Sequence, residues 1–445
     1  MTSSDHTRIF ASAATPNLSV LGFYSDTMQV IGLPGVSTRQ HASLSDGGPN
    51  AVRILSLASH EIRHWFDFVG TLWGQRLLVD YFNAIHARLG DDPEQFYLIK
   101  SYKDKAATTG FDDYYTTVHP GASSGGVGTW SQRMTIGKRF THTGHPSPDL
   151  RIMFVRFSTI DGLEVARCPL SVAALLEAGA VYEETNAAKR LAFEMKNSGR
   201  PLSAPESAEI RKNLDLFYEP KLMKYSAAAH LVARETGRLN SIDALSIAAT
   251  ISALSLNLPS EYYSKLSFVE GRFAEEPNSD EAKRARADYE LLKAEKYPAV
   301  AFRTLLYYLA PGFRTDLTLP ERLLSNAGLP SLVEIEQACR DEMRMLPDNL
   351  HGGEFFEYAT KLLSLGGEIF EERGVLGLEL SPLDALRNQR LLPPIFLADG
   401  GSMFQRAGDP LLASLARRVD VLKKGIGDRP GVLEQMAEFC SVCGV

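Results

Sequence analysis

Cysteine is scarce in this chain, and long apolar runs are missing. Four cysteines in 445 residues are too few for a disulfide framework, which makes the reducing cytoplasm the simplest location. No apolar stretch approaches the roughly 18 residues that a membrane-spanning helix needs, so we expect no membrane segment. The first residues also lack the basic and apolar regions of a secretory signal. These absences together predict a cytoplasmic protein.

Positive charge is not in excess either. Lysine and arginine number 47 against 54 aspartates and glutamates, which gives a formal net charge of −7. A basic surface is the usual electrostatic feature of nucleic-acid binding, so we do not expect a nucleic-acid partner. Hydrophobic residues make up 44% of the chain and charged residues 23%, as in globular proteins with a substantial core. The length predicts roughly two or three domains.

One short motif indicates a chemistry. His60, Glu61 and His64 form an H-E-x-x-H pattern in a segment with helical periodicity. A spacing of four residues brings both imidazoles to one face of a helix, one turn apart, where they can bind Zn²⁺ together. The glutamate beside the first histidine can reach a metal-bound water and act as a general base. The motif therefore predicts a hydrolytic zinc site.

A coincidental pair of helix histidines is the alternative interpretation. The helix should begin at a cap on Asn50 and end near Val69, and apolar residues occupy nearly all of its sides, which predicts burial. Buried histidines and carboxylates need partners, and a metal ion supplies them. Asp67 lies near the same face, where an ion pair with Arg63 or a supporting contact to a histidine is favoured over direct metal binding.

A catalytic zinc site needs a third protein ligand, and two common patterns for it fail. In the pattern H-E-x-x-H-x-x-G-x-x-H, Asp67 replaces the glycine and Gly70 replaces the third histidine. The aspartate variant G-T-x-x-D fails too, because Gly74 stands where the aspartate should be. A glutamate on a later helix remains.

Glu177 is the best candidate for that glutamate. Ser171 is a good cap for the start of its helix, and the flanking residues are apolar or small, which allows close approach of another helix. A lone carboxylate in such surroundings is costly unless it is paired or metal-bound. Glu184 and Glu354 remain alternatives, although Glu184 is better interpreted as a solvated acid and Glu354 as an ordinary acid of a first helical turn.

These residues give the chain a resemblance to the zincin metallopeptidases, in the gluzincin-like layout where H-E-x-x-H is followed by a helix of the type E-x-x-A-x-Y-x-E. The resemblance covers roughly residues 15–197, with a long gap before Glu177 that implies an insertion. It implies that His60, His64 and Glu177 bind zinc, with Glu61 as the general base. It also implies an oxyanion stabiliser, for which the available side chains are Tyr182, His119, Tyr114 and Tyr115. The sequence does not choose among these four, and Tyr182 is carried forward with Glu61 as a predicted catalytic residue.

The pattern of segments predicts an α+β protein that is predominantly α-helical. Residues 1–200 should form a small zincin-like α/β region that carries the catalytic site. Residues 201–445 should form a helical domain that shapes a substrate channel or binds a partner.

Individual elements are also predicted. The first region should contain short strands at 19–24 and 28–32, a second helix at about 75–89, a flap-like loop at about 105–132 and a hairpin at 151–167. Helical segments should follow at about 206–237, 241–257, 280–310, 331–346, 353–373 and 403–426.

The sequence thus predicts a zinc-dependent metallopeptidase that cleaves a protein or peptide with water activated by Glu61. Without a secretory signal, such an enzyme would need narrow specificity or a regulatory protein partner, as in a toxin, a stress response or phage defence. Two alternatives stay open. One is a helical interaction or scaffold protein with a structural or non-catalytic metal site, and the other is a zinc hydrolase of non-peptide substrates.

Overall fold

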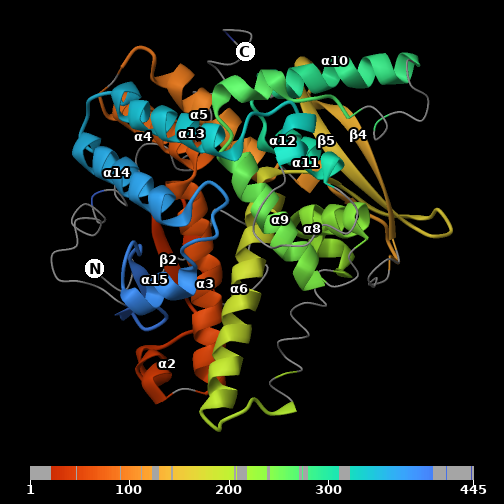
Figure 1. Ribbon diagram of the computed structural model, residues 1–445. Coiled ribbons are helices and arrows are strands. Elements are labelled where there is room, and N and C mark those ends of the chain that lie inside the picture. Colours follow the sequence, from red (N-terminus) through yellow and green to blue (C-terminus); the bar gives the residue numbers. More distant parts are fainter. Residues whose placement is uncertain are drawn as a thin grey trace.

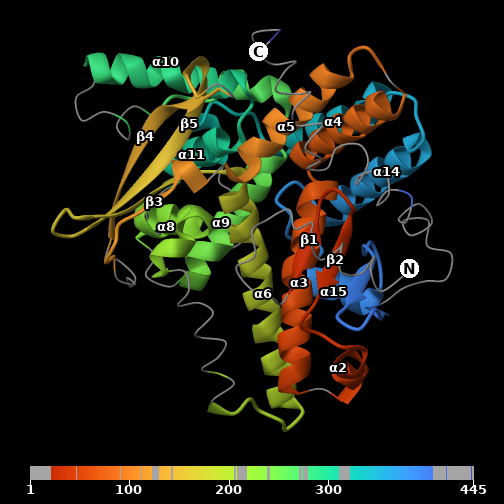
Figure 2. The ribbon, with the colours of Figure 1, turned by 180° about the vertical axis from the view of Figure 1, so that it is seen from behind.

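Two long helices, α3 (Pro49–Gly70) and α6 (Val172–Asn197), lie side by side and run in opposite directions (Figures 1 and 2). The other elements pack around this pair. The computed structural model describes residues 22–46, 48–90, 92–111, 113–122, 130–141, 144–204, 207, 218–237, 241–269, 273, 279–309, 321–403, 417 and 442. In this part of the chain the protein is a mainly helical α+β protein with two small sheets, as the sequence predicts.

The helix α3 carries the H-E-x-x-H motif. It begins at Pro49, whose fixed φ suits a first helical turn, after Gly48 with a φ of 112°. The prediction that Asn50 caps this helix is wrong, because Asn50 lies inside the first turn and its side chain donates to the Ser43 hydroxyl at 3.5 Å. The predicted burial is confirmed: Trp65 and Phe66 have no exposed surface.

The helix α6 begins as the sequence predicts. The Ser171 hydroxyl accepts a hydrogen bond from the backbone N–H of Ala174 at 3.2 Å and so caps the first turn. The first half of the helix is almost entirely buried, and its small residues let α3 approach closely. This close approach brings the side chains of the two helices together.

The first sheet joins both parts of the sequence. β1 (Phe23–Ser25) and β2 (Val30–Leu33) pair antiparallel, which confirms the two predicted short strands where the chain is described. β2 then pairs in parallel with β7 (Ile395–Leu397), which pairs with β8 (Ser402–Met403). The two late strands were not predicted from the sequence. In this sheet β1 is an edge strand among the described strands.

The second sheet has the order β3-β6-β5-β4. The hairpin of β5 (Pro146–Thr159) and β6 (Glu164–Pro169) confirms the predicted one. β3 (Thr117–Val118) and β4 (Trp130–Phe140) complete the sheet. The predicted loop over 105–132 is therefore shorter than expected: residues 105–110 end a helix, 130–132 begin β4, and 123–129 lie outside the described residues.

Helices make up most of the remainder. Beyond α3 and α6 the α-helices of six residues or more in the described part of the chain are α4 (Leu72–Leu89), α5 (Gln95–Gly110), α8 (Met223–Thr236), α9 (Ser241–Leu256), α10 (Asp280–Ala294), α11 (Pro298–Tyr308), α12 (Glu321–Asn326), α13 (Leu332–Met345), α14 (Phe356–Arg373) and α15 (Pro382–Asn388). The segment predicted at 280–310 is two helices, because Pro298 begins a new one. Of the segment predicted at 403–426, only residues 403 and 417 are described.

Contacts cross the predicted division at residue 200. β2 pairs with β7, and α3 packs against α14 and α15. The division into two domains stays a prediction. Among the described residues no single helix is long and apolar enough to cross a membrane, and only the bent pair 220–236 and 241–256 reaches that composition when taken together.

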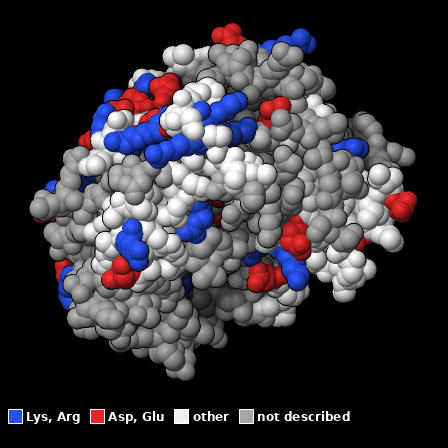
Figure 3. Space-filling model, turned by 90° about the horizontal axis from the view of Figure 1, so that it is seen from below, with Lys and Arg blue, Asp and Glu red and all other residues white. Residues whose placement is uncertain are grey.

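Acidic and basic side chains lie next to one another on the lower face of the molecule (Figure 3). Exposed ion pairs also join neighbouring elements. Glu194 of α6 accepts from Arg387 of α15 at 2.5 Å, and Glu372 of α14 accepts from Arg390 at 2.6 Å. Such exposed pairs contribute little stability each, about 0–1 kcal/mol, so the packing of the buried helices sets the geometry of the protein.

Candidate metal centre

His60 and His64 lie one turn apart on α3 and face the same side. Their Nε2 atoms are 3.2 Å apart, and the ring centroids are 4.9 Å apart at an interplanar angle of 79°. The side chain of His64 is 2% exposed and that of His60 is 17% exposed. The helical spacing in the sequence therefore does place both imidazoles together, and His60 is the more exposed of the two.

Glu177 reaches this pair from α6. One carboxylate oxygen is 3.6 Å from His60 Nε2 and the other is 3.6 Å from His64 Nε2. Two atoms that each bind a tetrahedral zinc ion at about 2.0–2.1 Å are roughly 3.3 Å apart. The 3.2 Å between the two Nε2 atoms is close to that value, and each ring has one Glu177 oxygen 3.6 Å away. His60, His64 and Glu177 thus form a group of two nitrogens and one carboxylate that could hold a metal ion, buried between α3 and α6.

The electrostatics of this group favour a positive charge beside its carboxylates. Burial lowers the pKa of His64 well below its ordinary value, helped by the charges of His60 and Arg63. Burial also raises the pKa of Glu177. Burial alone would lower the pKa of His60, but the hydrogen bond to Glu184 and the neighbouring carboxylates raise it to about 10. The acids thus favour a positive charge at this point, which a proton or a metal ion can supply.

Glu61 lies on the same helix, and its carboxylate is packed against the edge strand β1. A Cβ on Gly22 would lie 2.9 Å from Glu61 Oε1, so the absence of a side chain at Gly22 makes room for the carboxylate. Glu61 also has a hydrogen bond with the backbone of Tyr24. Burial, with repulsion from Glu177 and Glu184, raises the pKa of Glu61 to about 8 against the opposing effect of His60.

This raised pKa makes the stability of the metal-free protein depend on pH. A carboxyl group whose pKa rises on folding from 4.5 to about 8 stabilises the fold below pH 4.5, and this contribution is lost as the pH rises through 8. Glu61→Gln removes the titration. We expect the variant to gain stability over the wild type between pH 5 and pH 8, by roughly 1–3 kcal/mol. Thermal unfolding in a chelator at the two pH values measures this, and a difference that is the same at both contradicts the assigned burial.

Glu184, seven residues after Glu177 on α6, contacts the other side of the His60 ring. Its Oε2 lies 3.0 Å from His60 Nδ1. The prediction that Glu184 is an ordinary solvated acid is therefore wrong, although its side chain is still 27% exposed. By contrast, His64 Nδ1 is buried and has no hydrogen-bond partner among the described residues. The two histidines thus differ at Nδ1: that of His60 has a carboxylate partner, and that of His64 has none among the described residues.

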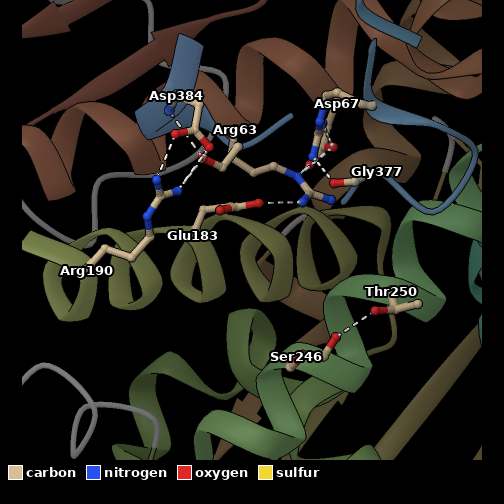
Figure 4. A network of polar contacts seen from close by, with 10 residues as sticks. Arg63, Asp67, Glu183, Arg190, Ser246, Thr250, Gly377 and Asp384 are labelled. Carbon is tan, nitrogen blue, oxygen red and sulfur yellow. Dashed lines mark hydrogen bonds and ion pairs between the residues drawn. The ribbon is translucent and has the colours of Figure 1, made fainter. Parts of the chain in front are cut away.

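Asp67 belongs to a buried network of charges with Arg63 and Glu183 (Figure 4). Arg63 donates from Nε to both carboxylate oxygens of Asp67, at 2.8 and 2.9 Å. Arg373 of α14 lies 3.6 Å from Asp67, and Glu183 of α6 lies 3.6 Å from Arg63. The predicted ion pair of Asp67 with Arg63 is present. These two arginines and two acids connect α3, α6 and α14.

Gly179 lets α6 pass close to this network. A Cβ on Gly179 would lie 2.9 Å from Arg63 Cζ, and Arg63 cannot easily yield because it is fully buried and bonded to Asp67. We expect Gly179→Ala to destabilise the protein, since about 1–3 kcal/mol of crowding outweighs the gain of up to about 1 kcal/mol from alanine in a helix.

Gly367→Ala on α14 is the matched control, because a Cβ there would meet no atom within 4 Å. It should stabilise the protein slightly, so the two variants should differ by about 2 kcal/mol in denaturant unfolding. Equal stabilities of the two variants would show that Arg63 moves aside freely.

The remaining candidates lie elsewhere or have other partners. Tyr182 has a side-chain hydrogen bond with Ser246 of α9. His119 and Tyr114 are exposed, and the Tyr115 hydroxyl accepts from the backbone N–H of Phe140 at 2.8 Å. Glu354 forms an exposed ion pair with Arg417. The candidate metal-binding group thus consists of His60, His64 and Glu177, and the other side chains named in this paragraph do not belong to it.

Sequence reasoning missed several residues around the site. Glu183 and Arg373 belong to no sequence motif. Their part in the buried charge network is seen only from their ion pairs with Arg63 and Asp67. Tyr225 of α8 is buried. Burial is the largest cause of the raised pKa of its phenol, and the charge of Glu177 is the next. Comparisons with protein-family models, curated proteins and solved structures give no significant match. The interpretation of the site therefore depends on its own geometry.

Proposed function

We propose that this protein is a zinc-dependent peptidase. The observation that carries the proposal is the group of His60, His64 and Glu177, whose ligand atoms all lie within 4.8 Å of one another. Two imidazoles and a carboxylate leave one position of a tetrahedral zinc ion for water, which is the arrangement of catalytic rather than structural zinc. Bound zinc would lower the pKa of that water and polarise a carbonyl group.

Glu61 is the general base in this proposal. It lies between the two histidines on α3, and its carboxyl group interacts electrostatically with both His60 and Glu177. Glu61 would take a proton from the attacking water and deliver it to the leaving amine. A bound cation favours the ionised form of Glu61, which this role requires. Tyr225, whose phenol the charge of Glu177 reaches, and Tyr182 are the proposed alternatives for stabilising the oxyanion.

A peptide substrate is favoured by the motif itself. His60, Glu61 and His64 form the H-E-x-x-H pattern of a metalloprotease, in which two histidines bind zinc and the glutamate acts as general base. The proposal includes a protein or peptide substrate, a cytoplasmic location and control by narrow specificity or a protein partner.

Metal analysis and peptide hydrolysis test the proposal. The purified protein should contain close to one zinc ion per chain and cleave members of a peptide mixture. His60→Ala should lose both zinc and cleavage. His86→Ala is the matched control, because His86 is a buried histidine on α4 whose ring bonds the backbone oxygen of His351, and it should keep the zinc. Zinc without cleavage of any peptide would favour a non-catalytic site or a non-peptide substrate, and absence of zinc would refute the proposal.

A further inference from the structure

The helix α6 contacts the His60 ring with two carboxylates. Glu177 and Glu184 are seven residues apart, which is almost two complete turns, so both project from the same side of the helix. Glu177 faces Nε2 at 3.6 Å, while Glu184 faces Nδ1 at 3.0 Å. One nitrogen of the ring therefore points into the metal-binding group, and the other points to a separate carboxylate.

The contact with Glu184 decides which nitrogen of His60 carries a proton. A carboxylate only accepts hydrogen bonds, so the proton of a neutral His60 is held on Nδ1. The lone pair of Nε2 is then free for a metal ion. Without this acceptor the ring could place its proton on Nε2, where His64 Nε2 lies 3.2 Å away as an acceptor, and that proton would have to leave before a metal could bind.

The two histidines are not equivalent in this respect. His64 is oriented by packing inside the protein, since it is 2% exposed and its Nδ1 has no hydrogen-bond partner in the described part of the chain. His60 lies closer to water, with a side chain 17% exposed, so packing restrains it less. A directional hydrogen bond is the remaining means of fixing the orientation of its ring.

We propose that Glu184 is a positioning residue, which holds His60 in the orientation and tautomer that bind zinc. This inference rests on the proposed zinc site and adds a residue to it. Acids that accept from the outer nitrogen of a metal-bound histidine typically change metal affinity by about 10–100-fold. Glu184 does not touch the metal in this arrangement and acts only through His60.

Zinc affinity measured by competition with a chromogenic chelator tests this role. Glu184→Gln and Glu184→Ala should both weaken zinc binding by about 10–100-fold, with the larger loss in the alanine variant, because glutamine keeps a neutral acceptor. Glu194→Gln is the matched control. It removes a negative charge from the same helix, but Glu194 is paired with Arg387 and not with a histidine, so the variant should bind zinc as the wild type does.

A nitrogen NMR spectrum of histidine-labelled, zinc-loaded protein separates positioning from simple support of the fold. His60 Nδ1–H should be visible as a hydrogen-bonded proton in the wild type, and its signal should shift in Glu184→Gln while circular dichroism shows that the variant is still folded. Unaltered zinc affinity in both Glu184 variants would overturn this inference but leave the zinc site intact. A wild-type protein that binds no zinc would overturn the inference together with the proposed function.

Discussion

Glu61→Gln is expected to lower peptide hydrolysis by on the order of 10³-fold while the protein keeps its zinc. Glutamine has nearly the same shape as glutamate, so it should fit beside Gly22 and keep an oxygen for the backbone of Tyr24. It cannot take up a proton at neutral pH, so the attacking water loses its base. The ligands His60, His64 and Glu177 are not changed.

Single-turnover cleavage of a susceptible peptide, with zinc content measured on the same sample, checks this result. Glu357→Gln, an exposed acid on α14, serves as the control and should cleave at the wild-type rate. If Glu61→Gln retains zinc and still cleaves at the wild-type rate, another group must act as the base.

Glu177→Ala is expected to weaken zinc binding by more than about 100-fold, because loss of a direct ligand should exceed the effect of losing an outer-shell acceptor. The substitution removes the charged ligand and leaves two neutral imidazoles. The fold should persist. Among the described residues Glu177 forms ion pairs with the two histidines alone, and burial raises its pKa, so its charge contributes little stability without metal. Hydrolysis at limiting zinc should fall with the affinity.

Glu177→Gln provides the comparison for this prediction. It preserves the volume of the side chain and leaves a neutral, weaker oxygen ligand, so its zinc affinity should lie between those of the alanine variant and the wild type. Chelator competition gives the affinities, and circular dichroism of the zinc-free proteins checks the fold. If Glu177→Ala binds zinc as tightly as the wild type, the third ligand lies elsewhere, and Glu184 would be examined first.

The core of the site could be predicted because local spacing determines it. The spacing of four positions from His60 to His64 places both rings on one face of any α-helix, whatever surrounds it. Glu177 could be chosen because an acid among apolar and small residues needs a partner. The capping of α6 by Ser171 and the antiparallel hairpin of β5 and β6 follow from the same kind of local signal.

The remaining features depend on contacts between distant segments. Nothing near Glu184 in the sequence shows that a ring from α3 will lie 3.0 Å away, because that depends on how closely the helices pack. The same holds for Arg373, which reaches Asp67 across some 300 residues of sequence, and for β7, which pairs with β2. The cap of α3 was misplaced because Asn50 has the stronger capping propensity, whereas Gly48 and Pro49 determine the actual turn.

The placement of two acids on one side of α6 restricts how this stretch of polypeptide can change in length. Deleting or inserting a single amino acid between Glu177 and Glu184 would turn one of them by about 100° about the helix axis, away from His60. Substitutions at the intervening positions face no such rotation. Any chain that shares this centre should therefore conserve the interval E-x-x-x-x-x-x-E as strictly as the motif H-E-x-x-H, and the two intervals together offer a search pattern for undiscovered relatives.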